Sequence, residues 1–142
     1  MLELKSLAML TIATALLASC ASAAAVPAAP ASGGTINATL TDMKISVDKA
    51  AVPAGTVKFV VKNSGAVIHE LVVVKTDVAQ DKLVAGDEAG KVDETGNVGE
   101  TGDVVAGGSN TFSVLLPAGH YVLICNEVDH YMSGMHMTFT VN

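Results

Sequence analysis

The sequence predicts an all-β fold, an antiparallel Greek-key β-sandwich of about seven to eight strands. Three observations lead to this prediction. Val, Ile and Thr, which favour strands, are plentiful after residue 34. Short runs of these residues are separated by turns that contain Gly, Pro, Asn and Ser. No sustained apolar segment repeats with the period of about 3.6 residues that marks an amphipathic helix.

The first 20 residues are expected to be an export signal. Lys5 precedes an apolar run, Leu7–Ala18, which is too short to cross a bilayer of about 30 Å but suits a secretory signal. The run ends in Leu17-Ala18-Ser19-Cys20, which resembles a bacterial lipobox and makes Cys20 the expected lipidation site. Ala21-Ser22-Ala23 also fits ordinary signal cleavage, so plain secretion is the alternative.

Residues 21–34 consist almost entirely of Ala, Pro, Ser and Gly, a composition that is typical of a tether. The folded domain is therefore expected to cover residues 35–142. Together, the two N-terminal segments predict an exported protein. It would lie in the periplasm or another extracytoplasmic space, anchored to a membrane by lipid on Cys20.

Short β-rich runs bounded by turn residues give the expected strands of the domain. In order, they are Thr35–Leu40, Met43–Val47, Thr56–Lys62, His69–Lys75, Ser109–Leu116, Tyr121–Cys125 and Met135–Val141. Val57, Phe59 and Val61 alternate with more polar residues in the third run, which is typical of a strand with one buried face. The clearest turns are Pro53-Ala54-Gly55, Asn63-Ser64-Gly65 and Pro117-Ala118-Gly119.

An acidic, Gly-rich insertion occupies about residues 76–108. Between Asp77 and Asp103 there are eight acidic residues and two lysines, which account for the whole net charge of −6. This balance argues against binding to nucleic acid, or to anionic lipid through a basic surface. The insertion also lacks the Asp-x-Asp-x-Asp-Gly spacing of a calcium loop. It is either a solvated loop or a docking surface for a redox partner with a basic face.

The residues that carry chemistry lie around the connection between the last two expected strands. Cys125, His130 and Met135 follow one another as Cys-x4-His-x4-Met. A second imidazole is available in His69, at the start of an earlier strand. Two histidines, one cysteine and a weak methionine ligand form the donor set of a blue-copper site, because Cu(I) favours sulfur whereas Cu(II) favours nitrogen. The expected metal ligands are therefore His69, Cys125, His130 and Met135.

Two further histidines stay outside this expected site. In a strand, side chains alternate between faces, so His120 points away from Cys125 and His136 points opposite to Met135. Both are assigned to the surface. Recruitment of copper by His120 or His136 is one open alternative, and a zinc site of Cys125 with several histidines is another.

Segments around these ligands resemble the cupredoxins, in particular the small exported plastocyanin-like proteins of bacteria and archaea. The resemblance covers Thr35 to Asn142. It is carried by Val60-Val61-Lys62-Asn63-Ser64-Gly65 ahead of His69 and by Pro117-Ala118-Gly119-His120-Tyr121 ahead of Cys125. The resemblance implies a cupredoxin-like sandwich, one type 1 copper ion cycling between Cu(I) and Cu(II), and single-electron transfer to a redox partner protein.

The resemblance also implies a carrier rather than an enzyme. Copper oxidases and nitrite reductases of this family need further copper sites, which the four histidines of the chain cannot supply. The protein is expected to be a monomer. The alternative function is copper storage, delivery or sensing without a redox circuit. The Met- and His-rich segment at residues 132–137 favours this alternative.

Overall fold

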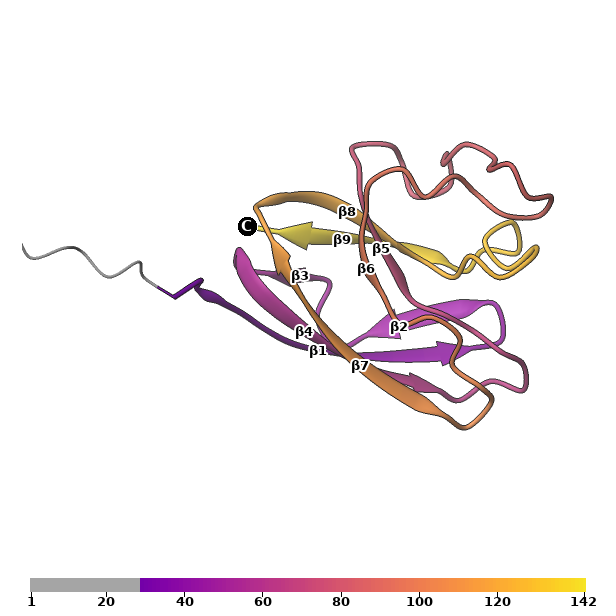
Figure 1. The fold of residues 1–142 in the computed structure, drawn as a ribbon, viewed down its shortest axis with the longest axis horizontal. Coiled ribbons are helices and arrows are strands. Elements are labelled where there is room, and N and C mark those ends of the chain that lie inside the picture. Colours follow the sequence, from indigo (N-terminus) through magenta and orange to yellow (C-terminus); the bar gives the residue numbers. More distant parts are fainter. Residues whose placement is uncertain (1–28) are drawn as a thin grey trace, which may run out of the picture.

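Two β-sheets face each other in the computed structural model, which describes residues 29–142 (Figure 1). The strands are β1 (Ser32–Thr41), β2 (Lys44–Val47), β3 (Ala51–Val52), β4 (Gly55–Asn63), β5 (Val72–Lys75), β6 (Asn97–Glu100), β7 (Ser109–Leu116), β8 (Gly119–Ile124) and β9 (His136–Val141). One sheet has the order β2-β1-β4-β7 and the other β3-β9-β8-β5-β6. This is the predicted β-sandwich. Cys20 and the expected export signal lie outside the described residues.

Both sheets are mixed, which differs from the purely antiparallel arrangement that the sequence suggests. β1 runs parallel to β4, with Ile36 opposite Phe59, and the short β3 runs parallel to β9. The other pairs, such as β4–β7 and β8–β9, are antiparallel. The parallel pair arises because the chain returns along β2, visits the other sheet in β3 and enters the first sheet again beside β1.

The core lies between the two sheets, and the alternation of β4 shows why. Val57, Phe59 and Val61 are fully buried, whereas Lys58 and Lys62 on the opposite face are exposed, as the sequence predicts. The Phe59 ring stacks on Phe112 of β7, with centroids 5.0 Å apart, and meets Phe139 of β9 at 5.8 Å. Aromatic rings from both sheets therefore hold the layers together, each ring burying a large apolar area.

The acidic insertion packs against the outer face of the second sheet instead of extending into solvent. Val92 is 3% exposed and belongs to a hydrophobic cluster with Val122 of β8. The Tyr131 hydroxyl accepts a hydrogen bond from the Leu83 N–H and donates one to the Gln80 carbonyl. The end of the insertion pairs with β5 as strand β6. From Tyr121 to Ile124, β8 is thus covered on both faces, by the sandwich core and by the insertion.

β1 starts at Ser32, slightly ahead of residue 35, where the folded domain is expected to begin. Gly33 is buried there, and a Cβ on it would lie 2.6 Å from Val57 Cγ2 and 3.0 Å from the Pro53 carbonyl. Only glycine allows this close approach. Within residues 29–142, no helix is long and apolar enough to span a membrane.

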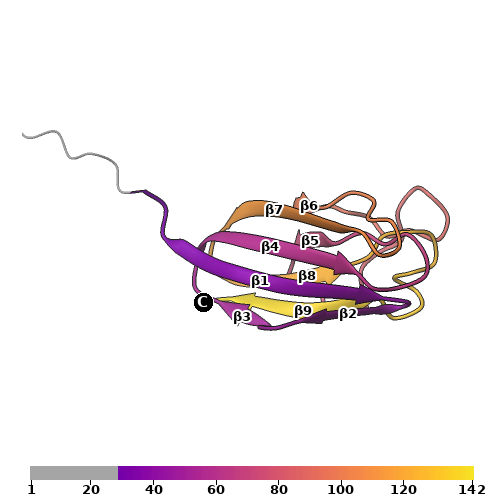
Figure 2. The ribbon, with the colours of Figure 1, turned by 90° about the horizontal axis from the view of Figure 1, so that it is seen from below.

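Connecting loops gather at the end of the sandwich away from the C-terminus (Figure 2). β8 points toward this end, so the loop that follows it starts there, and β5 starts there. His69, just before β5, forms an isolated bridge with Val104 of the β6–β7 connection. The Asp42 side chain in the β1–β2 turn accepts a hydrogen bond from the Ala66 N–H of the β4–β5 connection. Segments far apart in sequence therefore meet at one end of the fold.

Candidate metal centre

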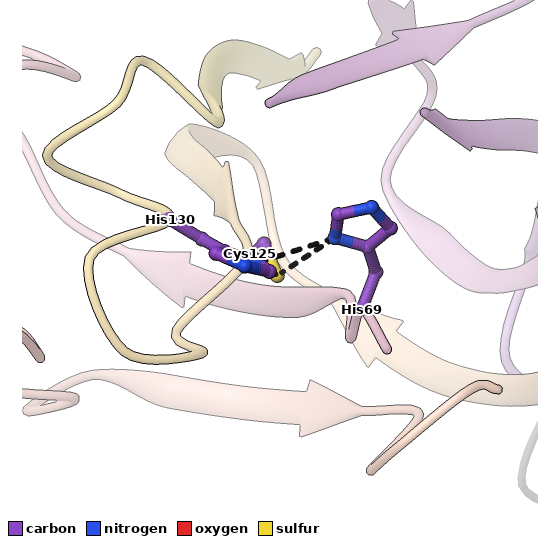
Figure 3. Close-up of side chains that lie close together, drawn as sticks. All are labelled: His69, Cys125 and His130. Atoms are coloured by element: carbon purple, nitrogen blue, oxygen red, sulfur yellow. Dashed lines mark hydrogen bonds between the residues drawn. The ribbon is translucent and has the colours of Figure 1, made fainter. Parts of the chain in front are cut away.

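Three donor atoms converge at this end of the sandwich (Figure 3). His69 lies just before β5, Cys125 directly after β8 and His130 in the loop between β8 and β9. The Cys125 Sγ atom lies 3.3 Å from His130 Nδ1 and 3.8 Å from His69 Nδ1. The two Nδ1 atoms are 3.2 Å apart. The structure therefore brings together three of the residues that the sequence predicts as ligands.

The spacing of these donors fits a single metal ion. Metal–ligand bonds of about 2.0 to 2.3 Å place neighbouring donor atoms about 3.3 to 4.0 Å apart. The two separations from Cys125 Sγ, 3.3 and 3.8 Å, fall in that range, and the 3.2 Å between the two Nδ1 atoms lies just below it. Two imidazole nitrogens and one thiol sulfur are also the in-plane donors that suit copper in both of its oxidation states.

Met135, the fourth predicted ligand, lies directly beside this cluster. It is fully buried and packs in the same core cluster as Cys125. Its carbonyl accepts a hydrogen bond of 3.0 Å from the Cys125 N–H, and its own N–H donates to the His130 carbonyl over 3.1 Å. Gly134, with a φ of 98°, supplies the left-handed turn that leads into Met135. The loop backbone thus ties the three residues to one another.

The Cys125 thiol sits in an apolar environment that disfavours its charged form. Burial raises the pKa of Cys125 to about 11, while the hydrogen bond from the Glu70 backbone N–H lowers it in part. That N–H lies 3.4 Å from Cys125 Sγ. Metals bind the thiolate, so loading the site releases the thiol proton. The buried sulfur therefore keeps its proton until a metal cation takes the place of that proton.

The two histidines differ in their exposure. His69 is fully buried, whereas His130 is partly exposed. Burial, followed by the neighbouring His69, lowers the pKa of His130. A lowered pKa favours the neutral imidazole, which is the form that binds a metal. His130 is thus the ligand through which the centre reaches the surface.

Buried amide side chains support the centre from outside it. Asn63 is fully buried and donates to the carbonyls of Val67 and Val104, which fixes the segment ahead of His69. Asn126 is 3% exposed. Its side chain accepts a hydrogen bond from the Val92 N–H and donates one to the Val92 carbonyl. Sequence reasoning does not assign these roles to the asparagines. Their positions, at the end of a strand and beside a ligand, are the signals that point to them.

The other two histidines stand apart from the three donors. His120 is exposed on β8, as expected for its face of the strand. His136 is partly buried, and its ring centroid lies 4.9 Å from that of Tyr131. Its Nδ1 atom is buried without a hydrogen-bond partner within residues 29–142. Neither ring belongs to the cluster of His69, Cys125 and His130.

Comparison with solved structures places the fold among blue-copper proteins. Auracyanin from the photosynthetic bacterium Roseiflexus castenholzii is 26% identical, with a TM-score of 0.59, over 78% of this chain and 97% of its own. Auracyanin A from Chloroflexus aurantiacus, described as a "blue" copper protein, is 25% identical, with a TM-score of 0.56, over 78% of this chain and all of its own. Rusticyanin from Thiobacillus ferrooxidans shares the fold at 18% identity, with a TM-score of 0.58, over 76% of this chain and 77% of its own.

No curated protein sequence matches the chain. In contrast, the sulfocyanin (SoxE) domain matches residues 14–142, which include both sheets and all the residues of the metal centre. The donor geometry, the fold and this match agree with one another. The chain belongs to the sulfocyanin (SoxE) family and is a cupredoxin.

Proposed function

We propose that the protein holds one type 1 copper ion through His69, Cys125, His130 and Met135 and passes single electrons outside the cytoplasm. The observation that carries this proposal is the convergence of two imidazole nitrogens and one thiol sulfur within 3.2 to 3.8 Å of one another. Met135 completes the set as the weak fourth donor from the same buried cluster.

The chain contributes rigidity and access to this function. When bound, copper supplies a one-electron couple between Cu(I) and Cu(II). Cys125 continues β8, which pairs with β5 and β9, and the His69 backbone is bonded to Val104 in both directions. Donors held by such pairing move little when the charge of the centre changes. A small rearrangement favours fast electron exchange.

Electrons enter and leave most directly at His130, because this ligand is partly exposed. Large apolar side chains are exposed in the loops at the same end of the sandwich. They are Val67, Ile68, Val105, Val128 and Met132, with relative exposures of 43% to 61%. A partner that covers this end excludes water from the path between the two redox centres.

The cellular setting that we propose follows from the sequence. A signal over residues 1–20 would direct export, and residues 21–31, up to the start of β1, would form a tether between a lipidated Cys20 and the folded domain. The buried Cys125 is the one free cysteine within residues 29–142, which agrees with a metal ligand rather than a disulfide in an oxidising compartment. The domain is proposed to act as a monomer.

The test of the copper proposal is the visible and EPR spectrum of the protein after addition of Cu(II). We expect an intense blue or green absorption band and a narrow parallel hyperfine splitting, which report a copper–thiolate bond. A pale solution with an ordinary square-planar signal would contradict the proposal. Slow electron exchange, combined with rapid release of copper to an acceptor, would instead support storage or delivery.

We also propose that the redox partner docks through a basic face. Glu70, Asp103 and Glu127 place carboxylate oxygens within 4.8 Å of one another, and Glu70 directly follows the ligand His69. Burial, and next the charges of Glu94 and Glu127, raise the pKa of Glu70 to about 7. Burial accounts for the largest part of this rise, and the rest reflects the negative charge of the neighbouring carboxylates beside the metal centre. Such a potential attracts cations and speeds the encounter with a basic partner.

Neutralising two of these carboxylates is expected to slow docking. With Asp103→Asn and Glu127→Gln combined, the rate of electron transfer to a small basic cytochrome c at low salt should fall about fourfold, since a charge pair 10 Å apart in water contributes about 0.4 kcal/mol. The rate should also depend less on salt. Stopped-flow kinetics over a salt series measures both. Asp77→Asn, at the far end of β5, is the matched control, and equal rates in all three proteins would contradict the basic-partner proposal.

A further inference from the structure

We propose that Asp42 is a positioning residue that holds His69 in the tautomer and orientation needed for metal binding. This inference rests on the copper site proposed above. It concerns a carboxylate in the β1–β2 turn, far from the metal ligands in sequence, and the side of the His69 ring that faces away from Cys125.

The hydrogen bond between the two side chains is the first observation. His69 Nε2 lies 3.2 Å from Asp42 Oδ1, and within residues 29–142 Asp42 is its hydrogen-bond partner. A carboxylate only accepts hydrogen bonds, so Nε2 carries the proton. The other nitrogen, Nδ1, is then left with a free lone pair. That lone pair belongs to the atom 3.8 Å from Cys125 Sγ and 3.2 Å from His130 Nδ1.

The two side chains differ in burial, and this difference indicates that Asp42 orients His69. The His69 side chain is fully buried, whereas the Asp42 side chain is 51% exposed. A buried imidazole N–H without an acceptor would cost about 1 to 3 kcal/mol, so the ring depends on this contact. A carboxylate at the edge of solvent can be held there at little cost. Asp42 thus reaches in from the surface and fixes the buried ring.

Asp42 is itself held in place by the loop that precedes His69. Its Oδ1 atom accepts a second hydrogen bond, of 2.9 Å, from the Ala66 N–H. The Ser64 N–H donates to the Leu40 carbonyl at the end of β1, over 2.7 Å, which ties the two turns together. The hydrogen bonds from Ala66 and His69 lower the pKa of Asp42, in that order of importance. The carboxylate is therefore anchored before any metal arrives.

The contact between Asp42 and His69 leaves no space for a side chain at Gly65. A Cβ on Gly65 would lie 2.4 Å from Asp42 Oδ1 and 2.8 Å from His69 Nε2, too close to both of the bonded atoms. Any larger residue at this position would push the carboxylate away from the ring. Glycine is thus required here for space. A carboxylate that orients a metal-bound histidine and raises its basicity is a general device of metal sites.

The experiment compares Asp42→Ala and Asp42→Asn with the parent protein. Asp48→Ala is the matched control, because Asp48 also accepts hydrogen bonds, from Asn37, but does not touch a ligand. The first readout is the tautomer of His69 in metal-free, 15N-labelled protein, observed by NMR. We expect a single Nε2–H tautomer in the parent and in the control, and a mixture of tautomers in Asp42→Ala.

The second readout is copper affinity, measured by competition with a chelator. Asp42→Ala should bind copper about 10- to 100-fold more weakly, the usual loss when a residue supporting a metal-bound histidine is removed. Asp42→Asn should keep the single tautomer, because its carboxamide oxygen stays toward the Ala66 and His69 donors. It should raise the reduction potential, since one negative charge near the centre is lost.

Two results would overturn the proposal: an unchanged tautomer, or an unchanged copper affinity, in folded Asp42→Ala. Gly65→Ala gives the same test by a second route if Asp42→Ala does not fold, because it separates the carboxylate from the ring. The metal-free NMR result does not depend on the copper proposal. A parent protein with the single tautomer but no blue copper spectrum would therefore contradict the proposed function. It would still support the hydrogen bond between Asp42 and His69.

Discussion

Replacing Cys125 with serine is expected to abolish the intense visible band of the copper-loaded protein and to leave a folded β-sandwich. The band requires a copper–thiolate bond, and among residues 29–142 Cys125 is the free cysteine. Serine keeps the shape of the side chain but loses the soft, ionisable sulfur that selects copper. Absorption and EPR spectra of Cu(II)-loaded protein measure the effect.

The folded state should survive because the substitution costs little compared with the stability of a domain. A buried hydroxyl costs about 1 to 3 kcal/mol when it is poorly paired, and the Glu70 N–H that now faces Cys125 Sγ remains available to the serine oxygen. Circular dichroism of the metal-free protein checks this point. Met132→Leu is the control, since it removes an exposed sulfur near the site and should keep the colour. A blue Cys125→Ser protein would disprove the assignment of the centre.

Replacing Phe59 with alanine is expected to lower the free energy of unfolding by about 3 to 5 kcal/mol. Phe59 is fully buried and joins the two sheets through its contacts with Phe112 and Phe139. Its truncation leaves a cavity between the layers that the surrounding strands cannot close. Since domains are stable by about 5 to 15 kcal/mol, this one change removes a large part of the total.

Denaturant unfolding of the metal-free protein measures this loss without a contribution from bound copper. Thr111→Ala is the control, because Thr111 is exposed on β7 and its truncation should change stability by less than about 0.5 kcal/mol. A loss below about 1 kcal/mol for Phe59→Ala would show that the sheets are not joined as described. Variant protein that stays folded should still take up copper, since Phe59 is not one of the ligands that we propose.

Much of the fold and of the metal centre can be predicted from local patterns. The alternation of Val57, Phe59 and Val61 specifies a buried face, and the structure confirms it. The donor residues Cys125 and His130 lie within one short loop, so their approach requires only that the loop form. Strand geometry also places Leu123 on the face of Cys125, and both belong to the inner core cluster.

The remaining features depend on contacts that no local pattern records. β3 has only two residues and β6 lies in a Gly-rich acidic segment, so neither shows a strand period. The parallel pairing of β1 with β4 follows from the path of the whole chain. The roles of Asp42 and Asn63 come from hydrogen bonds across long sequence separations. The packing of Val92, which belongs to the acidic insertion, against Val122 of β8 is likewise visible only in the folded protein.

The separation of the donors along the chain bears on the order in which the protein folds and binds its metal. His69 and Cys125 are 56 positions apart and meet only once β5 has paired with β8. An extended polypeptide would have to close that loop, against its entropy, before both donors could share an ion. We therefore expect the sandwich to close first and the cation to bind the complete set of donors afterwards. Where the chain folds decides which metal pool it meets.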